Sequence, residues 1–132
     1  MSEIVRVKDH KELYTRWRHL NGFDFGEDDL LLSVAIGAVQ RGLVLVVVTG
    51  GKSSAICIAT VDEGGVVRLH TLPQCSGESQ GKQCLDWVKA WAKEEGHKEI
   101  RVATENLSGA SFRYFEKTLN MRRRYVVFSV TV

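Results

Sequence analysis

The first stretch of the chain changes from strand-like alternation to helical spacing. Apolar and polar residues alternate in Ile4–Lys8, as they do along a half-buried strand. Apolar residues then recur at i, i+4 and i+7, at Leu13, Trp17 and Leu20. Asp9 precedes this run with a glutamate three residues later, the spacing of a capping box. The pattern predicts a strand followed by an amphipathic helix that begins just after Asp9.

The middle of the chain predicts a second helix and three consecutive strands. An acidic cluster at 27–29 leads into a segment with apolar residues at helical spacing, and Gly42 is predicted to end that helix. Leu43–Thr49 is apolar and rich in β-branched residues, which is typical of a strand buried on both faces. Ser54–Val61 and Val66–Leu72 follow, and glycine-rich turns connect the three strands. We therefore expect an antiparallel meander.

One of these turns, Gly50–Ser53, resembles the end of a phosphate-binding P-loop. The full motif also needs a glycine at the position of Val46 and a helix after its last serine. A strand is predicted after Ser53 instead. We interpret the segment as a hairpin turn.

The second half of the chain alternates helices with strands. Pro73 ends the third strand of the meander, because it cannot donate to a strand ladder. A polar loop runs to about Gln80, and a long amphipathic helix follows until Gly96. The remaining predicted elements are a strand at Glu99–Thr104, a helix at Ser108–Leu119 and a strand at Arg122–Val132. The order β-α-α-β-β-β-α-β-α-β predicts an α/β fold in which helices cover both faces of a mixed sheet.

Length and composition place the chain among ordinary globular domains. Its 132 residues are 44% hydrophobic and 26% charged, so we expect one domain over residues 1–132. An odd number of cysteines, three, without a CxxC pair argues against a disulfide framework, and their spacing to the histidines does not predict a metal site. The charged start of the chain and its short apolar runs predict neither a signal peptide nor a membrane helix. We expect a cytoplasmic protein.

Charge is unevenly divided between the two halves of the chain. Residues 1–66 hold 7 lysines and arginines against 9 acidic residues, and residues 67–132 hold 11 against 7. A net charge of −2 is thus followed by one of +4, which favours a phosphate-bearing ligand in the second half. The excess is too small for the basic stripe typical of duplex-binding proteins, so nucleic acid is not the expected partner.

The loop between Pro73 and Gly81 carries the most informative chemistry. It leaves a strand and enters the long helix, and Gly77 and Gly81 allow the backbone to approach a ligand closely. Free N–H groups and the dipole at a helix start bind anions, so a pyrophosphate fits this loop. A plain strand-to-helix connection without a ligand is the alternative.

These features resemble the GNAT (Gcn5-related N-acetyltransferase) family. Pro73 matches the proline that opens the family's phosphate loop, and Gly77 and Gly81 match two of its glycines. The run from Trp91 to Gly96 resembles the end of the family's long helix. Asn106 and the segment 115–121 resemble the family's later strand and helix, so the resemblance at residue level spans about residues 66–128.

The resemblance implies a cleft that binds acetyl-CoA as a cosubstrate, with no metal, and direct transfer of the acetyl group to an amine. Its implied partners are the CoA thioester and an amine acceptor; the apolar last strand also allows a homodimer if it lies at a sheet edge. The implied cofactor-binding residues lie at the strand end, in the loop, at the helix start and after the next strand: Leu72, Ser76, Gly77, Ser79, Gly81, Lys82 and Asn106.

Two candidate catalytic residues follow. His70 lies on the third meander strand, on the same face as Arg68, and histidine titrates in the range that suits a general base. Tyr114 is the candidate acid, because Phe115 stands where many family members have the tyrosine that protonates the departing thiolate. A surface or structural role is the alternative for His70.

The sequence departs from the family pattern at Ser76, Ser79 and Phe115. Ser76 stands in place of an arginine or glutamine, and Ser79 in place of the middle glycine. A second hypothesis is therefore a catalytically degenerate GNAT-fold protein that acts as a binding or structural component, such as a phage accessory protein.

Overall fold

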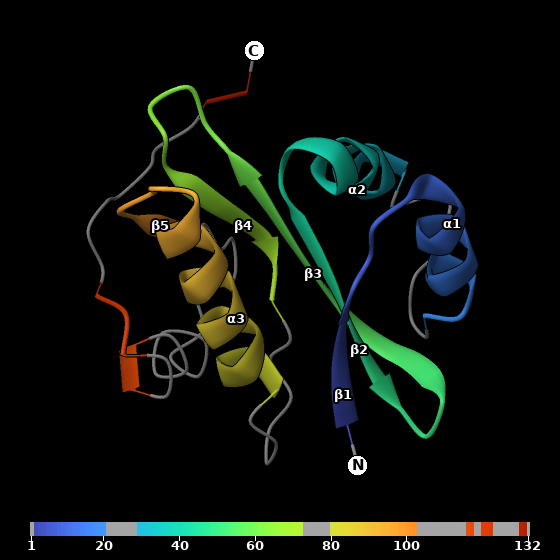
Figure 1. Cartoon of the computed structure of the whole chain (residues 1–132). Helices are drawn as coiled ribbons and strands as arrows, with labels where there is room; N and C mark the ends of the chain where they lie inside the picture. The colour runs from blue at the N-terminus through green and yellow to red at the C-terminus, as the bar shows by residue number, and fades with distance from the viewer. Residues whose placement is uncertain are drawn as a thin grey trace.

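A computed structural model describes most of the first three quarters of the chain (Figure 1). The described residues are 2–20, 29–72, 80–102, 116–117, 120–122 and 130–131. Most of the predicted helix at Ser108–Leu119 lies outside them. So does the middle of the strand predicted at Arg122–Val132, and the described ends of that segment, Arg122 and residues 130–131, are not in a strand.

Eight elements follow one another in the order that the hydrophobic pattern predicts. The strands are β1 (Ser2–Arg6), β2 (Leu43–Thr49), β3 (Lys52–Val61), β4 (Val67–Thr71) and β5 (Ile100–Val102). The helices are α1 (His10–Arg18), α2 (Asp29–Arg41) and α3 (Gln80–Glu94). None of the helices described is long and apolar enough to cross a membrane.

The five strands form one mixed sheet in the order β1-β2-β3-β4-β5. Neighbouring strands are antiparallel from β1 to β4, and β4 pairs with β5 in parallel. α3 connects these two parallel strands, as a β-α-β crossover requires. The predicted meander and the predicted parallel pair are both confirmed.

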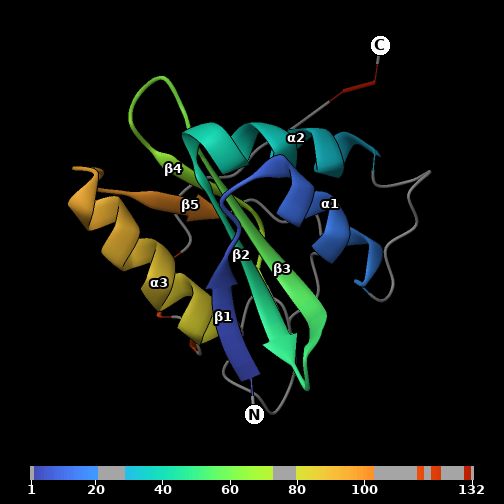
Figure 2. The same ribbon diagram turned by 45° about the vertical axis from the view of Figure 1, so that its right-hand side comes forward.

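Helices cover both faces of the sheet, as predicted, and each face has its own core (Figures 1 and 2). On one face α3 packs against alternate residues of β2, such as Leu43 and Leu45, and against Val67 and Leu69 of β4. On the other face α1 and α2 pack against Val44, Val46, Ile56 and Ile58. β2 is therefore buried on both faces, in agreement with its continuous apolar sequence.

The helix boundaries are set by specific backbone contacts. Asp9 caps α1, since its Oδ1 accepts the backbone N–H of Glu12 at 2.7 Å. Gly96 ends α3 with a φ of 82°, the left-handed conformation typical of a glycine after a helix. Gly42 ends α2 for another reason: a Cβ there would lie 2.2 Å from the carbonyl oxygen of Ala59. The residue between α2 and β2 thus lies so close to the backbone of β3 that only glycine fits.

The turn between β2 and β3 is shorter than predicted. Gly50 and Gly51 have φ values of 60° and 79°, as a type I′ turn requires, while Lys52 and Ser53 already belong to β3. A strand follows these glycines instead of a helix, so the segment is a hairpin turn and not a P-loop.

Two cysteine thiols connect the sheet to α3. Cys57 of β3 and Cys84 of α3 are free thiols, and both are buried in the α3-side core. The hydrogen bond to Cys84 and the burial of the thiol raise the pKa of Cys57 well above its usual value. Cys57 therefore remains a neutral core residue, and the pair fixes the first turns of α3 against β3.

Candidate functional site

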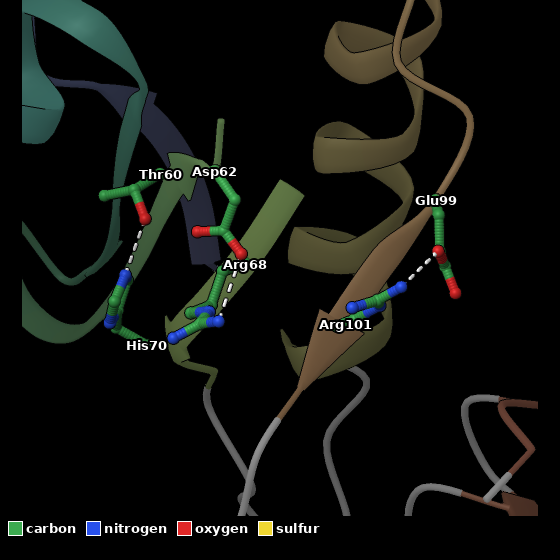
Figure 3. Close-up of polar contacts among 6 residues, drawn as sticks. All are labelled: Thr60, Asp62, Arg68, His70, Glu99 and Arg101. Atoms are coloured by element: carbon green, nitrogen blue, oxygen red, sulfur yellow. Dashed lines mark hydrogen bonds and ion pairs between the residues drawn. The ribbon is translucent and has the colours of Figure 1, made fainter. Parts of the chain in front are cut away.

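The candidate site is built around a β-bulge near the end of β4. Thr71 pairs with Ile58 and Leu69 pairs with Ala59, so His70 is an extra residue without a ladder partner on β3. Val67 and Leu69 are buried toward α3, whereas Arg68 and His70 are exposed on the opposite face. The predicted shared face of His70 and Arg68 is thus confirmed (Figure 3).

The imidazole of His70 is held by the neighbouring strand. Its Nε2 lies 2.7 Å from the Oγ1 of Thr60 on β3. Partial burial and the positive charge of Arg68 lower the pKa of His70, and the negative charge of Asp62 opposes them. The imidazole is therefore neutral at neutral pH. In the tautomer with a proton on Nε2, Thr60 accepts that proton's hydrogen bond and Nδ1 carries a free lone pair.

Two ion pairs lie on the same sheet face as His70. An Nη2 of Arg68 donates to Oδ2 of Asp62 at 3.0 Å, and an Nη2 of Arg101 donates to Oε2 of Glu99 at 3.0 Å. Figure 3 shows these pairs on adjacent strands beside His70. The sequence analysis did not identify Arg101, Asp62 or Glu99 as site residues. A parallel alignment of β4 with β5 would have suggested Arg101, because it pairs in register with Arg68.

The predicted cofactor residues that the structure describes lie on the α3 side of the sheet. Leu72 follows β4 and packs, half-buried, against the α3-side core. Gly81 is buried in the first turn of α3, and Lys82 beside it is exposed. Leu72 therefore packs with the α3-side core. His70, on β4, lies on the opposite face of the sheet.

The other predicted site residues lie outside the described part of the chain. They belong to the loop before α3 and to the segment after β5: Ser76, Gly77, Ser79, Asn106 and Tyr114. Their predicted roles therefore remain predictions. Among the described residues, His, Cys, Asp and Glu side chains form no group of three that is suited to a metal ion.

The first turn of α3 carries a positive side chain and no negative one. An isolated helix favours acidic residues in its first turn, because the dipole is positive there. α3 has no acidic residue in its first turn and has Lys82 instead. The donors that suit a pyrophosphate, backbone N–H groups and an ammonium, are therefore present at this helix end.

The charges around His70 make a measurable prediction about its titration. Replacing Arg68 by glutamine removes the charge that lowers the pKa of His70, so this pKa is expected to rise. Asp62→Asn removes the opposing charge, so the pKa is expected to fall. NMR titration of the imidazole protons measures both shifts, and Arg16→Gln, which removes an arginine paired with Glu12 on α1, is the matched control. Shifts of the same sign in both site variants would refute this electrostatic description.

Comparison with known proteins places the fold. No family model and no curated protein matches the sequence. Solved structures match over the full chain, among them the aminoglycoside N-acetyltransferase AAC(6')-Iy in complex with a CoA bisubstrate analogue, with a TM-score of 0.72, 18% identity, and coverage of 100% of this chain and 99% of that one.

Two further structures show how widely this fold is used. An IAA acetyltransferase from Bacillus cereus matches with a TM-score of 0.65 and 18% identity, over 89% of this chain and 75% of its own. A transcriptional regulator from Bacillus halodurans matches with a TM-score of 0.69 and 15% identity, over 100% of both chains. The chain thus has the GNAT fold that the sequence predicts.

Proposed function

We propose that this protein is an N-acetyltransferase that moves an acetyl group from acetyl-CoA to an amine. The observation that carries the proposal is His70, a histidine with a lowered pKa on the bulge of β4, just before the chain leaves the sheet toward the start of α3. It is an exposed base on the strand that precedes α3 in the chain, and the first turn of α3 carries a lysine and no acidic residue, which suits a pyrophosphate. Likeness to acetyltransferase structures over nearly the full length of both chains supports the same assignment.

Each group of residues has a separate task in this proposal. The backbone N–H groups at the start of α3 and the ammonium of Lys82 hold the pyrophosphate, and Ser76, Gly77 and Ser79 extend this cradle. Leu72 and Asn106 contact the pantetheine arm. When bound, acetyl-CoA supplies an acetyl group activated as a thioester. Tyr114 is the proposed proton donor to the departing thiol group.

His70 is the proposed general base. An ammonium group has no lone pair and must lose a proton before its nitrogen can attack a carbonyl. The neutral imidazole accepts that proton at Nδ1 directly or through a water molecule. Thr60 positions the ring, because its hydroxyl oxygen lies 2.7 Å from Nε2 and can accept a hydrogen bond from Nε2–H in the neutral tautomer and in the imidazolium. The lowered pKa keeps His70 unprotonated at neutral pH, so activity is expected to fall only as the pH drops through that lowered pKa.

Calorimetry with CoA and acetyl-CoA tests the cofactor half of the proposal. We expect micromolar binding to the purified protein. Lys82→Glu is expected to weaken binding by about tenfold, because one ion pair with a phosphate is lost and a repulsion is added. Lys89→Glu makes the same charge change on the same stripe of α3, two turns further from the helix start, and is expected to leave the affinity within twofold.

The opposite result supports the second candidate function. Ser76 and Ser79, which replace two usual residues of the phosphate loop, favour a protein that has kept the fold and lost the cofactor. Absence of binding at millimolar CoA would refute the acetyltransferase proposal. The protein would then be a binding or structural component, and its partner would be sought among macromolecules.

A further inference from the structure

Two arginines lie side by side on the sheet face that carries His70. Arg68 of β4 and Arg101 of β5 are register partners in the parallel pair. The residues before and after them, Val67, Leu69, Ile100 and Val102, pack toward α3, so strand alternation directs both arginines to the other face. Figure 3 shows both side chains on that face, with His70 further along β4.

Both arginine side chains keep exposed surface although each has a carboxylate partner, and Arg68 is the more exposed of the two, because the Nε of Arg101 is buried. The side chain of Arg68 is 51% exposed and that of Arg101 is 40% exposed. The ion pair of Arg68 with Asp62 uses Nη2, and a guanidinium offers five N–H donors in a planar fork. The Arg68–Asp62 pair is exposed, and exposed ion pairs contribute little to stability, so a ligand anion can share or displace the carboxylate of Asp62 at small cost.

Arg68 and Asp62 act on His70 in opposite directions, and the effect of Arg68 on its pKa is the larger. The positive charge of Arg68 opposes protonation of the ring. The same charge opposes the approach of an ammonium group, which is the form of most amines at neutral pH. A polycationic acceptor would bring further positive charge close to Arg68. An acceptor that carries its own negative charge would not.

We infer that Arg68, flanked by Arg101, is an anion subsite and that the acceptor is a small amine bearing a carboxylate or phosphate. This inference rests on the proposed function and names the acceptor class of the same site. The Cα atoms of residues two apart on a strand, such as Arg68 and His70, are separated by about 7 Å. An acceptor whose amine reaches His70 would therefore place its anion on Arg68 across a few bonds. Arg–carboxylate and Arg–phosphate pairs are short, charge-assisted and frequently bidentate, so the subsite also orients the amine.

Matched pairs of amines test the inference. One pair is β-alanine and β-alaninamide, and the other is glucosamine 6-phosphate and glucosamine. The rate of acetyl transfer to each amine is measured from the free CoA thiol that acetyl-CoA releases. We expect kcat/KM to be at least tenfold higher for the anionic member of one pair or of both. The pair that shows the preference distinguishes a carboxylate acceptor from a phosphate acceptor. Arg68→Gln is expected to bring the ratio close to one, and Arg68→Lys to restore part of it.

Two controls separate the subsite from a general effect of charge. Arg16→Gln removes an ion-paired arginine from α1 and is expected to keep the full preference. Binding of each amine is also followed by NMR shift changes in the absence of acetyl-CoA. Binding of the anionic member that depends on Arg68, without any acetyl transfer, would uphold the subsite and refute the proposed activity.

Other results overturn the inference. Equal kcat/KM within both pairs, with acetyl transfer intact, would remove the anion subsite and leave the proposed activity standing. A preference that survives Arg68→Gln would show that the anion binds elsewhere. Neither transfer nor binding for any of the four amines would reject both proposals.

Discussion

Replacing His70 by glutamine is expected to lower kcat for acetyl transfer by about 10²–10⁴-fold, the usual contribution of a positioned general base. Glutamine keeps a polar group within reach of Thr60 but cannot accept a proton at neutral pH. The affinity for acetyl-CoA is expected to remain unchanged, since His70 lies on the sheet face opposite α3. Steady-state kinetics with calorimetry of the same variant separates the two effects.

A pH profile makes this test specific. The acid limb of the wild-type profile is expected to follow the titration of His70 and to disappear in His70→Gln. His97→Gln, which changes a half-buried histidine beside Trp91, is the matched control and is expected to keep the limb. A variant of His70 that retains half of the wild-type kcat would exclude this residue as the base.

Replacing Gly42 by alanine is expected to lower the free energy of unfolding by about 3 kcal/mol, the upper part of the range for overpacked sites. The added Cβ would lie 2.2 Å from the carbonyl oxygen of Ala59 and 3.3 Å from the Cα of Thr60. Both neighbours are backbone atoms of β3, so relief requires the α2–β2 junction to move away from β3. Urea unfolding followed by tryptophan fluorescence measures the change.

The same substitution at Gly64 is the control. A Cβ at Gly64 would meet no atom within 4 Å, and its φ is outside the left-handed region. Gly64→Ala is expected to change the free energy of unfolding by less than about 0.5 kcal/mol. Equal stability of the two variants would show that the α2–β2 junction and β3 do not approach as closely as the structure indicates.

Most of the fold could be predicted because each element has a local sequence signal. Continuous apolar residues identified β2, and helical spacing with a capping aspartate identified α1. The positions at which helices and strands end were harder to predict, since they depend on tertiary contacts. Gly42 was assigned as a helix-ending glycine, but it is required by the proximity of Ala59, which is 17 positions away in the sequence. No local pattern encodes such a contact.

The candidate site was predicted only in part, for a related physical reason. His70 and Arg68 could be placed on one face because strand residues alternate. The contact with Thr60 depends on the bulge, which shifts the register of β4 against β3 by one residue. The pairing of Arg68 with Arg101 depends on a parallel strand that follows the whole of α3. Register between strands is a tertiary property, so these partners could not be read from spacing along the chain.

The β3–β4 hairpin has a consequence for how the site is assembled and how it can diversify. Thr60, Asp62, Arg68 and His70 all belong to this hairpin, within eleven consecutive positions. Their relative positions thus depend on a local segment of the sequence. Because the loop between β3 and β4 is short, bringing them together has a small entropic cost during folding. Arg101 arrives from a distant part of the sequence. In the proposed site, substitutions in β5 are therefore expected to adjust acceptor selectivity through the flanking Arg101, while Arg68 and the proposed base stay together in one hairpin.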